Sequence, residues 1–332
     1  MGIVFDIATS AEFWRRFYPL NRSPATAAPV IPGQSTYLEN DALSFVPSWM
    51  AHDLLDELDG VLHLLAFDAS QRRRSEKRII HVCTDSLPEG SFYRLSDDIA
   101  VMSPACMFLS AATVLRLPKL IAFGYELCGY YSFDARQKRG FRKRTVPLVT
   151  IRQLGDYLEK ANQCQGRVRA TTALQYVVEH SASPMETFDA MAMCLPYRLG
   201  GYGLRKFEMN HSIPLTCRAA RIAKRQTCYA DMCYPAINLD VEHHGKYDHC
   251  SPEEMAADRA RVNALKEMGY EVVELTAEQV EDLFAFEYII QRIARLDGKR
   301  ISKKKLGALP QRITLRKELF GWNRSQGRLR MR

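Results

Sequence analysis

The segment from Asp231 to His244 constrains the fold of this chain more than any other stretch. It predicts a strand that carries Asp231, a short turn and a second strand. Because side chains alternate along a strand, one face of the second strand would carry Ile237, Leu239 and Val241, and the other would carry Asp240, Glu242 and His244. Burying two acids and an imidazole is costly unless they are paired or metal-bound. We therefore expect the polar face to line a cleft.

The two acids on neighbouring strands suggest a metal site. Asp231 and Glu242 are the expected ligands of Mg²⁺ or Mn²⁺, because hard carboxylate oxygens suit a hard cation. Such an ion can activate water and stabilise the charge that develops on a phosphate during phosphodiester hydrolysis. The alternative is a surface hairpin with solvated acids. Asp240 shares the polar face, and we expect it to support the site without binding the metal.

The composition places the chain among soluble globular proteins. Its 332 residues are 47% hydrophobic and 25% charged, and the length suits two or three domains. The most apolar run, from Val101 to Phe123, is interrupted by prolines and charged residues, so we expect buried helices and no membrane partner. Nine cysteines without framework spacing indicate free thiols and a cytoplasmic location.

The positive charge is concentrated at the C-terminal end. The chain carries a formal charge of +8, and residues 299–332 hold twelve Lys or Arg against one acid, which makes this segment +11 and residues 1–298 about −3. This distribution favours a clamp on a nucleic-acid backbone over a solubilising tail. The residues expected to bind nucleic acid are Lys303, Lys304, Lys305, Arg312, Arg316, Lys317 and Arg324.

Helix and turn signals divide the chain into five parts. Four prolines predict an extended arm over residues 1–40, followed by an α+β domain over 41–149 and a helical connector over 150–182. From 183 to 298 the order is helix, strand, strand, helix, strand, helix, and 299–332 form the basic tail. We expect an α/β (α+β) protein whose C-terminal mixed sheet has helices on both faces.

Residues 183–297 contain an ordered set of motifs: Ser183-Pro-Met-Glu186, Asp231, Leu239-Asp-Val-Glu-His-His-Gly245, Asp258-Arg-Ala-Arg261 and Met268-Gly-Tyr-Glu-Val-Val-Glu-Leu-Thr276. In this order they resemble the PD-(D/E)XK nuclease superfamily, and within it the branch of the very-short-patch-repair endonuclease. The resemblance implies an α-β-β-β-α-β sandwich and a Mg²⁺-dependent endonuclease or nicking enzyme acting on nucleic acid, most readily DNA, in phage defence or repair.

A fainter resemblance covers residues 41–149, which are similar to the N-terminal part of AbiEi-like proteins of abortive-infection toxin–antitoxin systems. It is carried by Arg78-Ile-Ile-His-Val-Cys83 and Asp98-Ile-Ala-Val-Met-Ser-Pro104. This likeness implies a toxin–antitoxin or defence partner. It also raises the alternative function, a non-catalytic nucleic-acid-binding or antitoxin-like regulator that keeps a nuclease fold.

The nuclease resemblance also assigns roles to individual residues. The lysine position of the third motif falls on His244, whose imidazole can act as a general base, and Lys246 could supply the positive charge instead. Glu186 either reaches the metal or closes a capping box with Ser183. Retention of Asp231 and Glu242 favours an active nuclease, whereas the missing lysine favours a protein that binds nucleic acid without cleaving it.

Two other groups have simpler interpretations. Asp258 and Arg261 match helix positions of the family, and we expect an internal salt bridge from them. A zinc site would need the mixed set Cys228, Cys233, His243, His249 and Cys250. Their spacing does not follow a structural-zinc pattern, so zinc is disfavoured.

Overall fold

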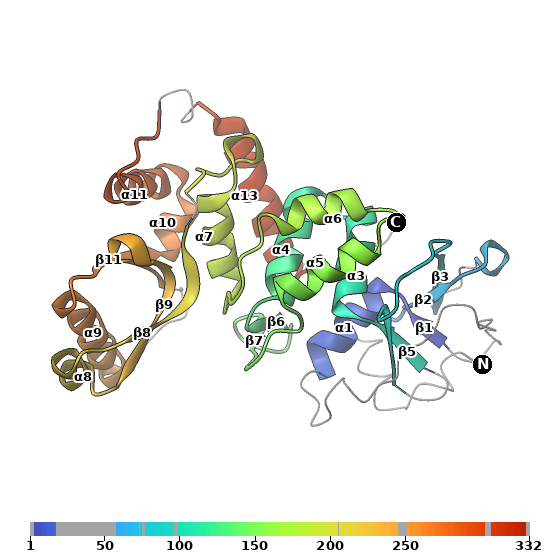
Figure 1. Ribbon diagram of the computed structural model, residues 1–332, viewed down its shortest axis with the longest axis horizontal. Helices are drawn as coiled ribbons and strands as arrows, with labels where there is room; N and C mark the ends of the chain where they lie inside the picture. The colour runs from blue at the N-terminus through green and yellow to red at the C-terminus, as the bar shows by residue number, and fades with distance from the viewer. Residues whose placement is uncertain are drawn as a thin grey trace.

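The computed structural model describes residues 3–17, 58–72, 74, 77–95, 99–204, 206–244, 251–302 and 307–329. A five-stranded sheet belongs to the N-terminal part and a four-stranded sheet to the C-terminal part, with helices and a small hairpin between them (Figure 1). The expectation of a mixed α/β protein is therefore confirmed. In the described part of the chain, no helix is long and apolar enough to cross a membrane.

The N-terminal sheet has the strand order β3-β2-β1-β5-β4. Its strands are β1 (Ile3–Phe5), β2 (Leu62–Ala66), β3 (Arg78–Val82), β4 (Phe92–Arg94) and β5 (Ile99–Met102), and a 3₁₀ turn, η2 (Ala69–Gln71), follows β2. The central strand β1 pairs parallel to β5 and antiparallel to β2. All residues of β1 and β5 are buried, as expected for strands covered on both faces.

The prediction of an extended arm over residues 1–40 is wrong at its start. Residues 3–5 form the central strand β1, and α1 (Ile7–Phe17) packs against β2, β5 and α3 (Pro104–Val114). Phe13 and Trp14 are buried, and the Trp14 indole Nε1 donates to the Met102 carbonyl at 2.7 Å. The prolines that suggested an arm lie between residues 19 and 32, which are outside the described residues.

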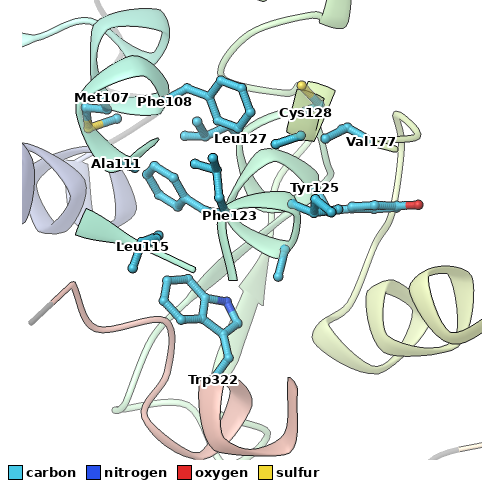
Figure 2. Close-up of a cluster of buried hydrophobic side chains, with 14 of the residues drawn as sticks. Met107, Phe108, Ala111, Leu115, Phe123, Tyr125, Leu127, Cys128, Val177 and Trp322 are labelled. Carbon is cyan, nitrogen blue, oxygen red and sulfur yellow. The ribbon is translucent and has the colours of Figure 1, made fainter. Parts of the chain in front are cut away.

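A helical layer follows the N-terminal sheet. It contains α3, α4 (Leu117–Leu127), α5 (Ile151–Lys160) and α6 (Arg167–Leu174). Thr150 and Gln153 form a capping box at the start of α5, and the helices α5 and α6 of the predicted connector pack on α3 and α4 and are part of this layer. Figure 2 shows the core between these helices, where Phe123 packs against Trp322 from the far end of the chain. The hairpin of β6 (Tyr131–Phe133) and β7 (Phe141–Lys143) extends from this layer.

The C-terminal sheet has the order β11-β10-β9-β8. Its strands are β8 (Glu208–Pro214), β9 (Thr227–Tyr234), β10 (Leu239–His244) and β11 (Glu271–Thr276). The first three are antiparallel, and β10 pairs parallel to β11. The short 3₁₀ turn η4 (Pro235–Ile237) joins β9 to β10, so Ile237 precedes the strand in which it was predicted.

Helices before, between and after these strands complete the C-terminal unit. They are α7 (Pro184–Cys194), the 3₁₀ turn η3 (Tyr197–Leu199), α8 (Cys217–Ala223), α9 (Pro252–Glu267), α10 (Ala277–Glu281) and α11 (Leu283–Leu296). The sequence did not predict α8. The last helix of the predicted order is divided at Asp282, whose extended backbone and side chain cap a new helix.

The basic tail is not an appendage. Residues Leu309–Arg324 form α13, which packs against α4, α7 and η3 (Figure 1). Leu315, Leu319 and Trp322 are buried because their spacing places them on one face of the helix. Lys303, Lys304 and Lys305 lie outside the described residues. The segment that carries most of the positive charge is thus partly built into the core.

Candidate functional site

The two acids predicted as metal ligands lie opposite each other on adjacent strands. The antiparallel register pairs Asp240 with Cys233 and Val241 with Met232, and its continuation places Glu242 across from Asp231. The backbone N–H of His243 donates to Asp231 Oδ2 at 3.0 Å. The sheet therefore holds both carboxylates at the same level of neighbouring strands.

A third carboxylate reaches this point from the first turn of α7. Ser183 caps α7 by accepting from the Glu186 N–H, but the Glu186 carboxylate accepts from the Ala182 N–H at 2.7 Å and from Asn210 Nδ2 at 3.2 Å. Asn210 has a φ of 47°, in the left-handed region, a conformation that asparagine tolerates better than most residues. The backbone of β8 is irregular at Asn210, and the side-chain amide of this residue points toward Glu186.

The carboxylates are close enough to affect each other's ionisation. Burial raises the pKa of Asp231 well above its usual value, and the negative charges of Glu242 and Glu186 raise it further. Burial also raises the pKa of Glu186. Burial and then the neighbouring Glu242 raise the pKa of Asp240 to about 10, so Asp240 holds its proton more firmly than an ordinary carboxyl group. Such a cluster favours the arrival of a cation.

An arginine from α9 already neutralises part of this charge. Arg261 Nη1 lies 2.6 Å from Glu242 Oε1 and 4.0 Å from Asp240 Oδ2, and Nη2 lies 3.1 Å from Asp258 Oδ1. Burial lowers the pKa of Arg261, but its hydrogen bond to Glu242 and the surrounding acids outweigh this and raise it overall. The internal salt bridge expected for Asp258 and Arg261 is present, and it extends to Glu242.

The acids open into a cleft of about 1280 Å³. Glu186, Asp231, Glu242 and His244 all line it, so the structure brings the four predicted catalytic residues together. The β6–β7 hairpin contributes Lys138, Arg139 and Lys143 to its lining, and α13 contributes Arg316, Lys317 and Arg324. We call these residues the basic walls. This combination of acidic and basic side chains suits a site that binds a metal ion and a polyanion together.

The two histidines of β10 occupy different environments. The His244 side chain is 37% exposed, and its Nε2 lies 4.0 Å from Glu274 Oε1 on β11. The His243 side chain is buried and its Nδ1 is 2.7 Å from Oδ2 of the fully buried Asp189 on α7. Burial raises the pKa of Asp189, and the His243 contact opposes this rise. Sequence reasoning missed this pair. Its only signal was an acid in the otherwise apolar run Phe188-Asp-Ala-Met191.

The basic residues predicted to bind nucleic acid have different roles. Arg312 is 1% exposed, forms an ion pair of 3.0 Å with Glu287 and stacks over Tyr202, so its assignment to nucleic acid is wrong. Arg316 donates to the carbonyls of Val280 and Glu281 and packs against aromatic rings, so its main role is structural although it borders the cleft. Lys317 and Arg324 line the cleft and remain candidates.

The residues at the cleft fit a divalent cation only after a local change. Among the described residues, no group of three or more His, Cys, Asp and Glu side chains is already arranged to hold a metal. Asp231 and Glu242 supply the hard oxygen ligands that Mg²⁺ prefers, but Glu242 Oε1 is engaged by Arg261. Zinc gains no support, because Cys228 and Cys233 pack in an apolar cluster between β9 and α9. Lys246, His249 and Cys250 lie outside the described residues.

Comparisons with known proteins do not assign this chain to a family. No protein-family model matches it, and neither a curated protein nor a solved structure matches it.

Proposed function

We propose that the cleft hydrolyses phosphodiester bonds of nucleic acid with the help of Mg²⁺ or Mn²⁺. The observation that carries this proposal is the convergence of Glu186, Asp231 and Glu242, from three separate elements, on the floor of one cleft with basic walls. Ion pairs that only stabilise the fold do not require a large open cleft beside them. DNA is the substrate that the nuclease resemblance favours.

The order of elements supports the same proposal. The sequence α7, β8, β9, β10, α9 and β11 follows the α-β-β-β-α-β arrangement expected for PD-(D/E)XK nucleases, with α8 as an addition between β8 and β9. In this proposal Asp231 and Glu242 occupy the positions of the metal-binding acids. A cellular role in phage defence or repair, with a toxin–antitoxin or defence partner, remains part of the proposal.

In this proposal, different residues of the cleft have different roles in the reaction. Asp231 and Glu242 would hold the ion, which polarises the phosphate and lowers the pKa of a bound water. The basic walls hold the flanking phosphates. Hydrolysis joins the water oxygen to phosphorus and breaks one P–O bond to a sugar, and the departing sugar oxygen takes up a proton from solvent. His244, which lines the cleft and is partly exposed, can accept the proton released by the water.

A second candidate is nucleic-acid binding without cleavage. It is favoured by the Arg261–Glu242 ion pair, which already satisfies one proposed metal ligand. In this case the acids would be a structural network, and the basic walls alone would contact the backbone. An antitoxin-like regulator would have these properties.

Cleavage of end-labelled single-stranded and duplex oligonucleotides decides between the two candidates. We expect cleavage by the wild-type protein with Mg²⁺ or Mn²⁺ and none with EDTA. Glu242→Gln and Asp231→Asn should each lower the rate by about 10²-fold or more, the scale seen when one group that stabilises charge in the transition state is removed. Glu208→Gln, an exposed acid of β8 in the same sheet, is the matched control and should retain the wild-type rate.

Binding of the same oligonucleotides, measured in EDTA, distinguishes a protein that binds nucleic acid without cleaving it from one that does not bind nucleic acid. Binding without cleavage under every metal condition would establish the second candidate. Equal cleavage by wild type and Glu242→Gln would show that the activity belongs to another site or to a contaminant.

A further inference from the structure

We propose that Arg261 is the cation of the reaction centre: it holds Glu242 while the site lacks a metal, and it turns to the substrate phosphate when Glu242 binds the metal. This inference rests on the proposed function and names a catalytic residue that the sequence assigned only to a salt bridge. It also explains how a chain without the third-motif lysine could still place a positive charge beside the scissile phosphate.

The position of Arg261 supports this role. Its guanidinium is 12% exposed, lines the cleft and contacts Glu242 Oε1 at 2.6 Å, directly across the strand pair from Asp231. Its second terminal nitrogen is held at 3.1 Å by Asp258, which is half-exposed and also lines the cleft. Asp258 lies one helical turn before Arg261, so it can keep the arginine at the cleft after the contact with Glu242 is broken.

Other cations of the cleft are less well placed. His244 lies 4.0 Å from Glu274 at the β11 side of β10, and it carries a full positive charge only when protonated. Arg316 is held by the carbonyls of Val280 and Glu281. Lys143 belongs to the β6–β7 hairpin, where it contributes to the field at Glu186. Arg261 is therefore the cation with a direct contact to a proposed metal ligand.

Charge and geometry make the arginine and the metal compete. A cation held by the Glu242 carboxylate would lie beside the guanidinium whose Nη1 is 2.6 Å from Glu242 Oε1, and repulsion between the two positive charges would favour withdrawal of Arg261. A nucleic-acid phosphate in the cleft offers the released guanidinium a bidentate partner of the same charge as the carboxylate. Metal and substrate together would thus favour the released position of Arg261, whereas either one alone would favour it less.

The test compares Arg261→Gln with Arg259→Gln, which removes the same charge from an exposed position of α9. Mn²⁺ binding is measured by calorimetry without substrate. We expect Arg261→Gln to bind Mn²⁺ about 10-fold more tightly than the wild type, equivalent to the loss of a competing interaction of ~1.4 kcal/mol, and Arg259→Gln to bind as the wild type does.

Cleavage kinetics provide the second measurement. Although it binds metal more tightly, Arg261→Gln should show a kcat about 10²-fold lower with a small change in KM, because it lacks a group that acts on charge in the transition state. Arg261→Lys should recover part of kcat. Tighter metal binding together with lower kcat is a combination that a purely structural salt bridge would not produce.

Two results would overturn the inference and leave the proposed function standing. Wild-type or weaker Mn²⁺ affinity in Arg261→Gln would exclude competition, and an unchanged kcat would exclude the catalytic role. A third result, in which neither wild type nor Arg261→Gln binds Mn²⁺, would overturn the inference and the metal-dependent function together.

Discussion

Both sheets of this protein bury carboxylates, but they surround them differently. Asp6 directly follows β1 and is 2% exposed, with His81 Nε2 at 3.6 Å from its Oδ2. Burial lowers the pKa of His81 to about 4, so this imidazole is neutral at pH 7 and brings no charge to Asp6. In the C-terminal sheet, by contrast, Glu242 has the guanidinium of Arg261 and opens into the cleft.

The difference separates two uses of a buried acid. Burial raises the pKa of Asp6 to about 7, and this acid can stay in the core by taking up a proton. The acids of the C-terminal sheet lie beside a fixed cation and an opening that a polyanion and a metal can enter. Burial of acids alone therefore does not indicate a functional site, and the C-terminal acids differ from Asp6 by their countercharge and their open cleft.

The largest expected effect concerns Asp6. Its carboxyl ionises near pH 4 in the unfolded chain and near pH 7 in the folded protein, so the folded state binds more protons between these values. Stability should therefore fall as the pH rises from 4 to 7 and stay low above it. Asp6→Asn should remove this loss and stabilise the protein at pH 8 by up to roughly 4 kcal/mol, from three pKa units at 1.36 kcal/mol each.

Denaturant unfolding at pH 4 and pH 8 checks this prediction. The variant should match the wild type at pH 4 and exceed it at pH 8, with oligonucleotide cleavage unchanged. Glu89→Gln, an exposed acid in the same region, should change neither. Equal stability of Asp6→Asn and wild type at pH 8 would mean that Asp6 is held ionised, and the contrast between the sheets would fail.

Asp231→Asn should have a smaller effect of the same sign on stability. The raised pKa of Asp231 means that its ionisation costs stability as the pH rises, but the charge of Arg261 offsets part of this cost. We expect a gain of about 1 kcal/mol at pH 8, within the range of single-site effects. Unlike Asp6→Asn, this variant should also lose its thermal stabilisation by Mn²⁺, measured as the shift in Tm on adding the ion. A Tm shift equal to that of the wild type would show that Asp231 does not bind the metal.

The smallest effect concerns the basic walls. Lys143→Ala and Lys317→Ala change cations of two different elements that line the cleft, and each should reduce the log–log salt slope of binding by about 0.9 for duplex DNA or 0.7 for a single strand if it contacts one phosphate. Fluorescence anisotropy across a salt series measures the slope. Lys160→Ala, exposed on α5, is the control. Unchanged slopes for both wall variants would place nucleic acid elsewhere on the protein.

Alternation along a strand was enough to predict that Asp231 and Glu242 would meet, because pairing of adjacent strands is a local property. The same pattern could not show that α9 covers the acid face of β10, since Arg261 is 19 residues from Glu242 and reaches it only in the folded chain. Asp189 and His243 are 54 residues apart and were missed for the same reason.

The two errors at the ends of the chain have a common physical cause. Proline content suggested an arm at the N-terminus and basic content a tail at the C-terminus, and in both cases a short apolar pattern decided the structure. Trp14 contacts β5 and Trp322 contacts α4, and each holds its segment in the core. Composition averaged over 35 to 40 residues does not show which side chains enter the core.

Diffraction from crystals soaked in Mn²⁺ tests the central claim most directly, because the anomalous signal locates the ion without reference to activity. The account predicts an anomalous peak between the carboxylates of Asp231 and Glu242, with Arg261 withdrawn from Glu242 and no such peak in crystals of Glu242→Gln. A wild-type cleft without a peak at saturating Mn²⁺, with the Arg261–Glu242 pair intact, would contradict it.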